Sequence, residues 1–344
     1  MKWKQEYSAL TDYIANHAEI VINPTEISIP QVFRDEFYRR FDDLRSAFVD
    51  AHLSSLTIDF NSLCDNYLKI EREIVELLGL EGISMPVDLH TFVHNPKDGL
   101  MRILYTRAFD LLQGKITVEA FEEQSGIELR FVATELFRLG YEQWAALVLI
   151  KLLDPDEGFF VDLDEDYKPC LAELKTIAFG RQAHHPTLRI PEFVLHSRKL
   201  NKYVAVKMVL EREIETFVQP FKPAVRPKKK TGDTSFALDS RAMLLSFMDT
   251  PKDIPIIADI YELKRTSPDW MMEYIPGSEL SDPGALERVN QNVRAMNPKL
   301  GMCLVIVGSD TEARPEALLD GIRPIYVGFD QSRLQSVIDT FTVG

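Results

Sequence analysis

The chain has 344 residues, 45% of them hydrophobic and 27% charged, as expected of a globular protein large enough for two or three domains. A net charge of −14 excludes a generally basic surface that coats nucleic acid, and three widely spaced cysteines exclude a zinc knuckle and a disulfide framework. The sequence contains no run of eighteen apolar residues and no signal-peptide pattern, so we expect a cytoplasmic protein that does not enter a membrane.

Residues 1–155 are predicted to form a helical domain, because apolar residues recur at helical spacing along most of this region. The stripe that contains Phe37, Phe41 and Phe48 is typical of a helix packed against a core. A second stripe ends near Gly79, a residue type that commonly follows a helix. The predicted helices cover residues 30–53, 60–80, 100–112 and 127–153.

Residues 114–140 suit two short helices joined near Gly126. Two interpretations fit this pattern, namely a helical hairpin in a bundle and a DNA-binding helix-turn-helix. We favour the hairpin, because a recognition helix needs basic and amide side chains where this segment is acidic. The glutamates that would repel phosphate are Glu119, Glu122, Glu123, Glu128 and Glu135.

Residues 156–219 are predicted to be a mixed connecting segment. A strand is expected at 159–163, and helices are expected at 171–179 and 204–217 from their apolar spacing. The first of these helices contains Glu173-Leu174-Lys175. Because residues two apart do not share a face of a helix, we expect no functional site there.

Residues 220–233 are predicted to be an exposed linker, since they combine three prolines with a lysine triplet. Beyond the linker, residues 234–344 alternate strand and helix patterns, which predicts an α/β domain with a mixed sheet flanked by helices. Strands are expected at 236–247, 254–263, 302–307 and 324–329, and helices at 283–296, 315–319 and 331–341.

The apolar run that starts at Ile254 ends in Glu262-Leu263-Lys264. Alternate residues of a strand share a face, so Glu262 and Lys264 are expected side by side at the end of the strand. A site for a metal and a water molecule and a solvated ion pair at a strand end both produce this pattern. Asp239 is the preferred second carboxylate, because its strand is expected to pair antiparallel with the Glu262 strand; Asp249 and Asp259 are the fallbacks.

Ile260-Tyr-Glu-Leu-Lys-Arg265 resembles the strand ending of the PD-(D/E)xK nuclease superfamily, whose core is an α-β-β-β-α-β unit. Gln291, in the helix of residues 285–294, matches a glutamine often found there, and the strand of residues 303–308 follows in the expected order. Residues 322–334 are similar to the last strand and helix start of the Shedu-type antiphage nucleases. The resemblance covers about the last third of the chain, and no Pro-Asp precedes the Glu262 strand.

The resemblance implies a restriction-endonuclease-like fold and a metal-dependent DNA endonuclease or nickase in prokaryotic antiphage defence or restriction. It implies Asp239, Glu262 and the Leu263 carbonyl as ligands of Mg²⁺, or of Mn²⁺ in its place. Lys264 would then stabilise the attacking hydroxide or the phosphorane charge, and Gln291 would orient the site. The expected partners are DNA, further copies of this chain and a protein bound through the helical region.

Two alternatives belong to other functional classes. The first is a catalytically inactive nuclease-fold protein that serves as an assembly or nucleic-acid-binding module. The second is a helical transcription regulator that binds duplex DNA through residues 114–140.

Overall fold

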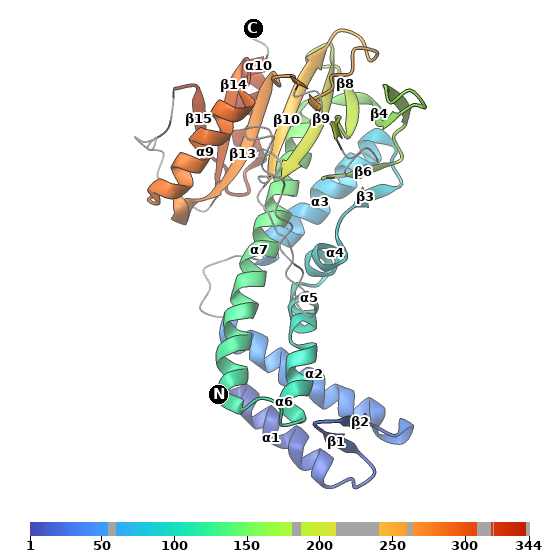
Figure 1. Cartoon of the computed structure of the whole chain (residues 1–344), viewed down its shortest axis with the longest axis vertical. Helices are drawn as coiled ribbons and strands as arrows, with labels where there is room; N and C mark the ends of the chain where they lie inside the picture. The colour runs from blue at the N-terminus through green and yellow to red at the C-terminus, as the bar shows by residue number, and fades with distance from the viewer. Residues whose placement is uncertain are drawn as a thin grey trace. The chain divides into compact units, whose positions relative to one another are not determined.

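The computed structural model of the chain describes residues 1–53, 60–180, 187–210, 241–259, 264–307, 318 and 320–341 (Figure 1). The chain divides into two compact units, unit 1 with residues 1–65 and 86–140, and unit 2 with residues 66–85 and 141–344. The predicted helical N-terminal region and C-terminal mixed sheet are confirmed. Within the described ranges, no helix has the length and apolar character to span a membrane.

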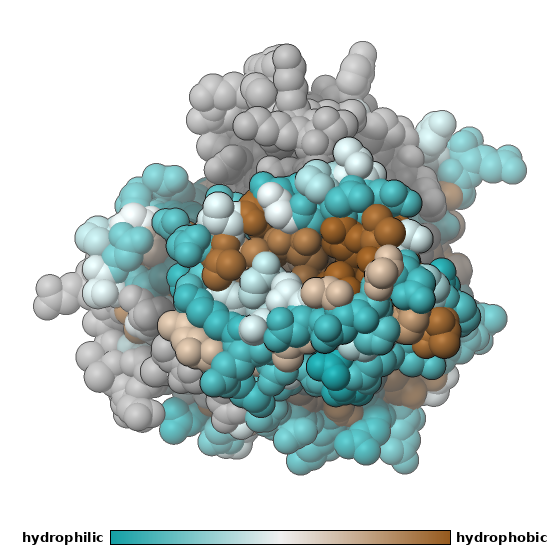
Figure 2. Space-filling model, turned by 90° about the horizontal axis from the view of Figure 1, so that it is seen from below, coloured by the Kyte–Doolittle hydropathy of each residue, from teal (hydrophilic) through white to brown (hydrophobic). Residues whose placement is uncertain are grey.

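Unit 1 is built from helices whose aromatic side chains form its core. Trp3, Phe48 and Phe121 are fully buried and pack ring against ring, with centroids 4.9 to 5.6 Å apart. Figure 2 views the end of unit 1 at which β1 and β2 are labelled in Figure 1. Apolar residues gather there in a hollow with a polar border. The elements are α1 (Lys2–Ala15), β1 (Val21–Asn23), β2 (Glu26–Ser28), α2 (Gln31–Leu53), α4 (Val87–His94), α5 (Pro96–Ile103) and α6 (Tyr105–Leu112), with parts of α3 (Phe60–Leu78) and α7 (Val118–Leu152).

The predicted break near Gly126 is wrong, since α7 is continuous through it. A glycine inside a helix costs only about 1 kcal/mol relative to alanine, which packing can offset. Gly126 is buried, and a Cβ atom built on it would lie 2.9 Å from the His52 ring, so this position favours the smallest residue. Neither a helical hairpin nor a helix-turn-helix is present at residues 118–140.

Unit 2 contains an eight-stranded sheet with the strand order β15-β14-β13-β10-β9-β8-β4-β5. The pairs β13–β14 and β14–β15 are parallel, and the other neighbours are antiparallel. The strands are β4 (Pro155–Leu163), β5 (Pro169–Glu173), β8 (Phe193–Ser197), β9 (Lys202–Leu210), β10 (Arg241–Met248), β13 (Trp270–Pro276), β14 (Gly301–Val307) and β15 (Ile322–Tyr326).

Two small sheets and several helices complete unit 2. The connection from β13 to β14 runs through α9, whose predicted bounds are confirmed. Asp282 caps its start by accepting a hydrogen bond from the Gly284 N–H, and Asn297 ends it in the left-handed conformation. The remaining elements are β3 (Gly82–Ser84), β6 (Thr176–Ala178), β7 (Leu188–Arg189), β11 (Ala258–Asp259), β12 (Lys264–Arg265), η1 (Gly277–Glu279), α9 (Pro283–Met296), η2 (Gln331–Leu334) and α10 (Gln335–Phe341).

One face of the eight-stranded sheet is covered by α9, and we call it the α9 face. The strand register places Lys207, Leu244 and Met271 in one row across β9, β10 and β13. Glu273 lies two residues beyond Met271 and therefore points to the same face. Val289 of α9 belongs to the same buried apolar cluster as Leu244 and Met271.

The opposite face carries a row of methionines and is covered by the last third of α7. Met208, Met243 and Met272 lie opposite one another on adjacent strands. Tyr274 follows on β13, and its ring lies 4.7 Å from the ring of Tyr141 on α7. Unit 2 therefore has a helix on each face of the sheet, as predicted for an α/β domain.

Two helices predicted in the connecting segment are wrong. Residues 171–179 contain β5 and β6, and residues 204–210 lie within β9; residues 211–217 are outside the described ranges. A short apolar run fits a helix pattern and a strand pattern equally well, so the pairing with neighbouring strands decides which of the two forms. Here β4 pairs with β5, and β8 and β10 pair with the valine-rich β9, whose branched side chains favour a strand.

The predicted strand pairing in the C-terminal domain is also wrong. β10 was expected to pair with residues 254–263, but it pairs with β9 and β13. The sequence prediction missed β13 altogether. The predicted strands at 302–307 and 324–329 correspond to β14 and β15, and the helix at 331–341 is confirmed as η2 and α10. Residues 220–233 and most of 315–319 lie outside the described ranges.

Candidate functional site

Three of the predicted metal-site residues, Asp239, Glu262 and Leu263, lie outside the described residues. Lys264 is described as the first residue of β12, where its backbone pairs with Asp259 of β11. β12 runs antiparallel to β11, and residues 254–257 lie outside any strand. The prediction of one strand from Ile254 to Leu263 is therefore wrong.

The other predicted residues lie at the surface. Gln291 is exposed on α9, where its side-chain amide donates a 3.1 Å hydrogen bond to Glu287 one turn away. Asp249, a fallback ligand, has an 87% exposed side chain that lies 3.8 Å from the Lys202 ammonium.

β11 is the central strand of a three-stranded sheet with β7 and β12. Ala258 lies between Arg189 and Arg265, and the Ile257 N–H donates to the Arg189 carbonyl at 2.8 Å. Pro255 shortens the strand relative to the prediction, since proline has no N–H for a ladder. The small sheet therefore brings together backbone segments that lie far apart in the sequence.

The small sheet adjoins the α9 face of the large one. The side chain of Ile257, directly before β11, is 4% exposed and belongs to the buried cluster of Leu244 and Met271. β7 leads within three residues to Glu192, which lies directly before β8. The segment that resembles a nuclease strand ending is thus flanked by residues on the α9 face.

Glu192 and Lys207 form a buried ion pair that the sequence analysis missed. Their side chains are 2% and 4% exposed, and the Lys207 Nζ lies 3.0 Å from the Glu192 Oε1. The same Glu192 oxygen accepts a 2.8 Å hydrogen bond from the Gly180 N–H, and Oε2 accepts a 3.4 Å bond from the Met208 N–H. Three donors therefore converge on one carboxylate.

The electrostatics of Glu192 are set by burial. Removal from water raises the pKa of Glu192, while the Lys207 ammonium and the two backbone N–H groups act in the opposite direction. A buried charge is tolerated only where its partners are fixed, and breaking such a pair is costly. The pair therefore fixes the geometry of β8 and β9 beside the small sheet.

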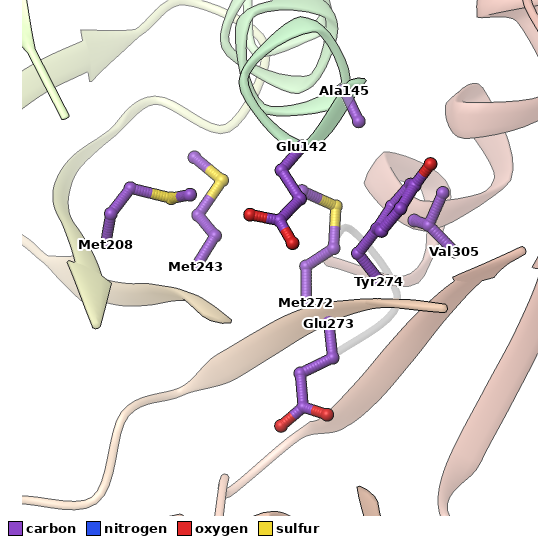
Figure 3. Close-up of a pocket in the computed structure, with 8 residues that line it drawn as sticks. All are labelled: Glu142, Ala145, Met208, Met243, Met272, Glu273, Tyr274 and Val305. Atoms are coloured by element: carbon purple, nitrogen blue, oxygen red, sulfur yellow. The ribbon is translucent and has the colours of Figure 1, made fainter. Parts of the chain in front are cut away.

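Glu273 is a second acid on the α9 face and was also missed. It lies on β13 with 7% of its surface exposed. By standard strand spacings its Cα atom lies roughly 12 Å from that of Lys207, two strands away. Figure 3 shows the Glu273 carboxylate on the opposite side of β13 from Glu142 of α7. Glu273 and Lys207 therefore flank one stretch of the α9 face.

The other face contains a small cavity between α7 and the methionine row (Figure 3). Its volume is about 10 Å³, which is room for a single water molecule. Glu142 and the side chains of Met208, Met243 and Met272 line it. A cavity of this size does not hold a substrate.

The described side chains do not form a metal site by themselves. Among the residues that the structure describes, no group of three or more histidine, cysteine or acidic side chains is arranged to hold a metal ion. The predicted donors Asp239, Glu262 and the Leu263 carbonyl are all hard oxygen ligands, which fit Mg²⁺ chemically. Substitution of those residues therefore tests the metal site.

No protein-family model, no curated protein and no solved structure matches this chain. One sequence signal for the missed pair exists. Lys207 interrupts the apolar run of residues 203–210, and a lysine within a buried strand requires an acidic partner.

Proposed function

We propose that this protein is a metal-dependent DNA endonuclease or nickase with a restriction-endonuclease-like domain in unit 2. The proposal rests chiefly on one observation, the strand order around α9. β9, β10 and β13 are consecutive antiparallel neighbours, and α9 then leads to β14, which is parallel to β13. Within the eight-stranded sheet this gives a β-β-β-α-β order like that of the PD-(D/E)xK core unit, although β11 and β12, which begin and end around the Glu262 motif, lie between β10 and β13 in the chain and belong to the small sheet.

The chemistry of the predicted donors supports the proposal. Hydrolysis of a phosphodiester requires carboxylates for a metal ion and a cation for the developing charge. In our proposal Asp239, Glu262 and the Leu263 carbonyl hold Mg²⁺ or Mn²⁺, and Lys264 stabilises the attacking hydroxide. The bound metal ion would polarise the phosphate and lower the pKa of a water molecule.

The buried acids act as positioning residues in this proposal. Glu192 holds β8 and β9 through Lys207, and β7 connects Glu192 to the strand that precedes the Glu262 motif. Glu273 lies on the strand that continues into α9. Gln291 stays a proposed orienting residue, and in the structure its amide donates to Glu287 on the exposed side of α9.

Plasmid cleavage tests the proposal. The full chain is incubated with supercoiled plasmid and Mg²⁺ or Mn²⁺, with EDTA as the blank, and the nicked and linear products are quantified. We expect metal-dependent cleavage that falls about 100-fold or more in Glu262→Ala and in Lys264→Ala. Unchanged cleavage in both variants would exclude the proposed site.

One observation favours the alternative of an inactive nuclease-fold module. The Glu192 carboxylate accepts hydrogen bonds from three donors and is closed to solvent, as expected of a structural ion pair. In that case the chain binds DNA or a protein without cleaving it. Salt-dependent duplex binding with no product in any metal would support the module and contradict the nuclease.

The biological setting is a further proposal. The resemblance of residues 322–334 to the Shedu-type nucleases suggests antiphage defence, with unit 1 serving assembly or regulation. Because α7 is a single helix, the regulator with a helix-turn-helix at 114–140 has no structural basis. Phage plaque counts on cells that carry the wild-type chain or Glu262→Ala test this setting. Equal counts would contradict a role of the nuclease in defence.

A further inference from the structure

Helix α4 presents two histidines on one exposed face. His90 and His94 are four residues apart, a spacing that places side chains above one another on a helix. Both residues are exposed, and their rings stack with centroids 4.2 Å apart and planes 24° apart. Two imidazoles thus lie parallel at the surface of unit 1.

The separation suits a shared metal ion. Zinc binds imidazole nitrogen at about 2.1 Å, so two nitrogens in tetrahedral positions lie roughly 3.4 Å apart. The ring centroids are 4.2 Å apart, and rotation about the side-chain torsions would turn one ring nitrogen of each histidine toward a shared ion. Two histidines at this spacing on one helix face are a known pair of zinc ligands.

The hydrogen bond of His94 selects the tautomer that binds metal. Its Nδ1 lies 2.9 Å from the His90 carbonyl oxygen, which can only accept, so Nδ1 carries the proton. In the neutral ring the lone pair then lies on Nε2. Metal-binding histidines commonly donate their other ring nitrogen to a carbonyl in this way, which fixes the orientation of the ring.

We propose that His90 and His94 chelate a divalent transition-metal ion, with Cu²⁺ bound more tightly than Ni²⁺ or Zn²⁺. Imidazole ligands favour these ions over Mg²⁺, and the order follows the general affinity series of first-row metals. Two protein ligands leave the remaining positions to water, so the ion exchanges. It would tie the start of α4 to its last turn, next to the Asn95–Pro96 start of α5.

A Cu²⁺ titration of the full chain tests the proposal. Because His184 and His185 are adjacent in the sequence, the titration uses a His184→Ala/His185→Ala background. Electron paramagnetic resonance counts the coordinated nitrogens, and calorimetry with Zn²⁺ gives the affinity. We expect two equivalent imidazole nitrogens, and an affinity about tenfold or more lower in either His90→Ala or His94→Ala.

The matched control is His17→Ala. The ring of His17 makes the same hydrogen bond to a carbonyl four residues earlier, but that residue is Tyr13 and supplies no second imidazole. We expect His17→Ala to bind Cu²⁺ as the background does. A second variant, His94→Gln, preserves a polar residue at this exposed position and guards against a folding defect. Retained affinity in both His94 variants, or a signal from a single nitrogen, would overturn the proposal.

Discussion

Glu192 and Lys207 form an ion pair inside unit 2, with the lysine Nζ 3.0 Å from Oε1 and neither side chain more than 4% exposed. The pair joins the residue that precedes β8 to the middle of β9, and two backbone N–H groups complete the environment of the carboxylate. Its burial beside the small sheet makes it a determinant of both stability and local geometry.

Replacing Lys207 alone should destabilise the protein strongly. Lys207→Met leaves the Glu192 carboxylate buried without its cation, which costs about 3 to 5 kcal/mol in comparable pairs. The free energy of unfolding is measured by urea denaturation. The double variant Glu192→Leu/Lys207→Met removes both charges and should recover much of the loss. A double variant as unstable as the single one would contradict this account of the pair.

The hydrogen bond between Tyr67 and Gln143 should stabilise the packing of α3 on α7 in unit 2. The Tyr67 hydroxyl donates to the Gln143 Oε1 at 3.0 Å, and both side chains are fully buried. Tyr67→Phe leaves that oxygen unsatisfied and should cost about 1 to 3 kcal/mol by urea denaturation. Tyr67→Phe/Gln143→Leu should be less destabilised than the two single variants predict together. Strict additivity would contradict the prediction.

Asp156 should make stability depend on pH in the acid range. Its hydrogen bond to His196 Nδ1, at 2.6 Å, holds the pKa of Asp156 below the ordinary value of 3.8. The folded state then binds this proton less readily than the unfolded state. The stabilisation is present above pH 3.8 and is lost as the pH falls through the lowered pKa.

Thermal unfolding of wild type and Asp156→Asn measures this effect. The stability difference should be positive at about pH 5 and should shrink as the pH falls toward about 3. Asp166→Asn is the control, since the Asp166 side chain is 78% exposed and lies in a turn. A difference that stays constant across this range, or that matches the control, would contradict the assignment.

The sequence predicted the helices that carry apolar residues at helical spacing along one face, including α2, α3 and α9. The sequence prediction failed where pairing between neighbouring strands decides the structure. β9 satisfied a helix pattern until its pairing with β8 and β10 was known, and β13 was missed because Trp270–Pro276 is buried on both faces. A strand buried on both faces has no alternation to recognise.

The candidate site was predictable only in part. The Glu262 motif stands out in the sequence, but its supporting residues Glu192 and Glu273 lie 70 residues before it and 11 residues after it. Their places on the α9 face depend on the pairings of β8 with β9, β9 with β10 and β10 with β13. The second copy at Glu173 was assigned to a helix, whereas the structure places Glu173 at the end of β5, with its carboxylate 3.7 Å from Lys175.

That second copy provides the most direct measurement, the rate of metal-dependent plasmid cleavage in Glu262→Ala relative to Glu173→Ala. Both variants remove a glutamate from a Glu-Leu-Lys sequence, and the Glu173 side chain is 80% exposed, so its loss should leave the fold intact. We predict that Glu173→Ala cleaves as wild type does, while Glu262→Ala is slower by about 100-fold or more. Equal rates in the two variants would contradict the proposed nuclease site.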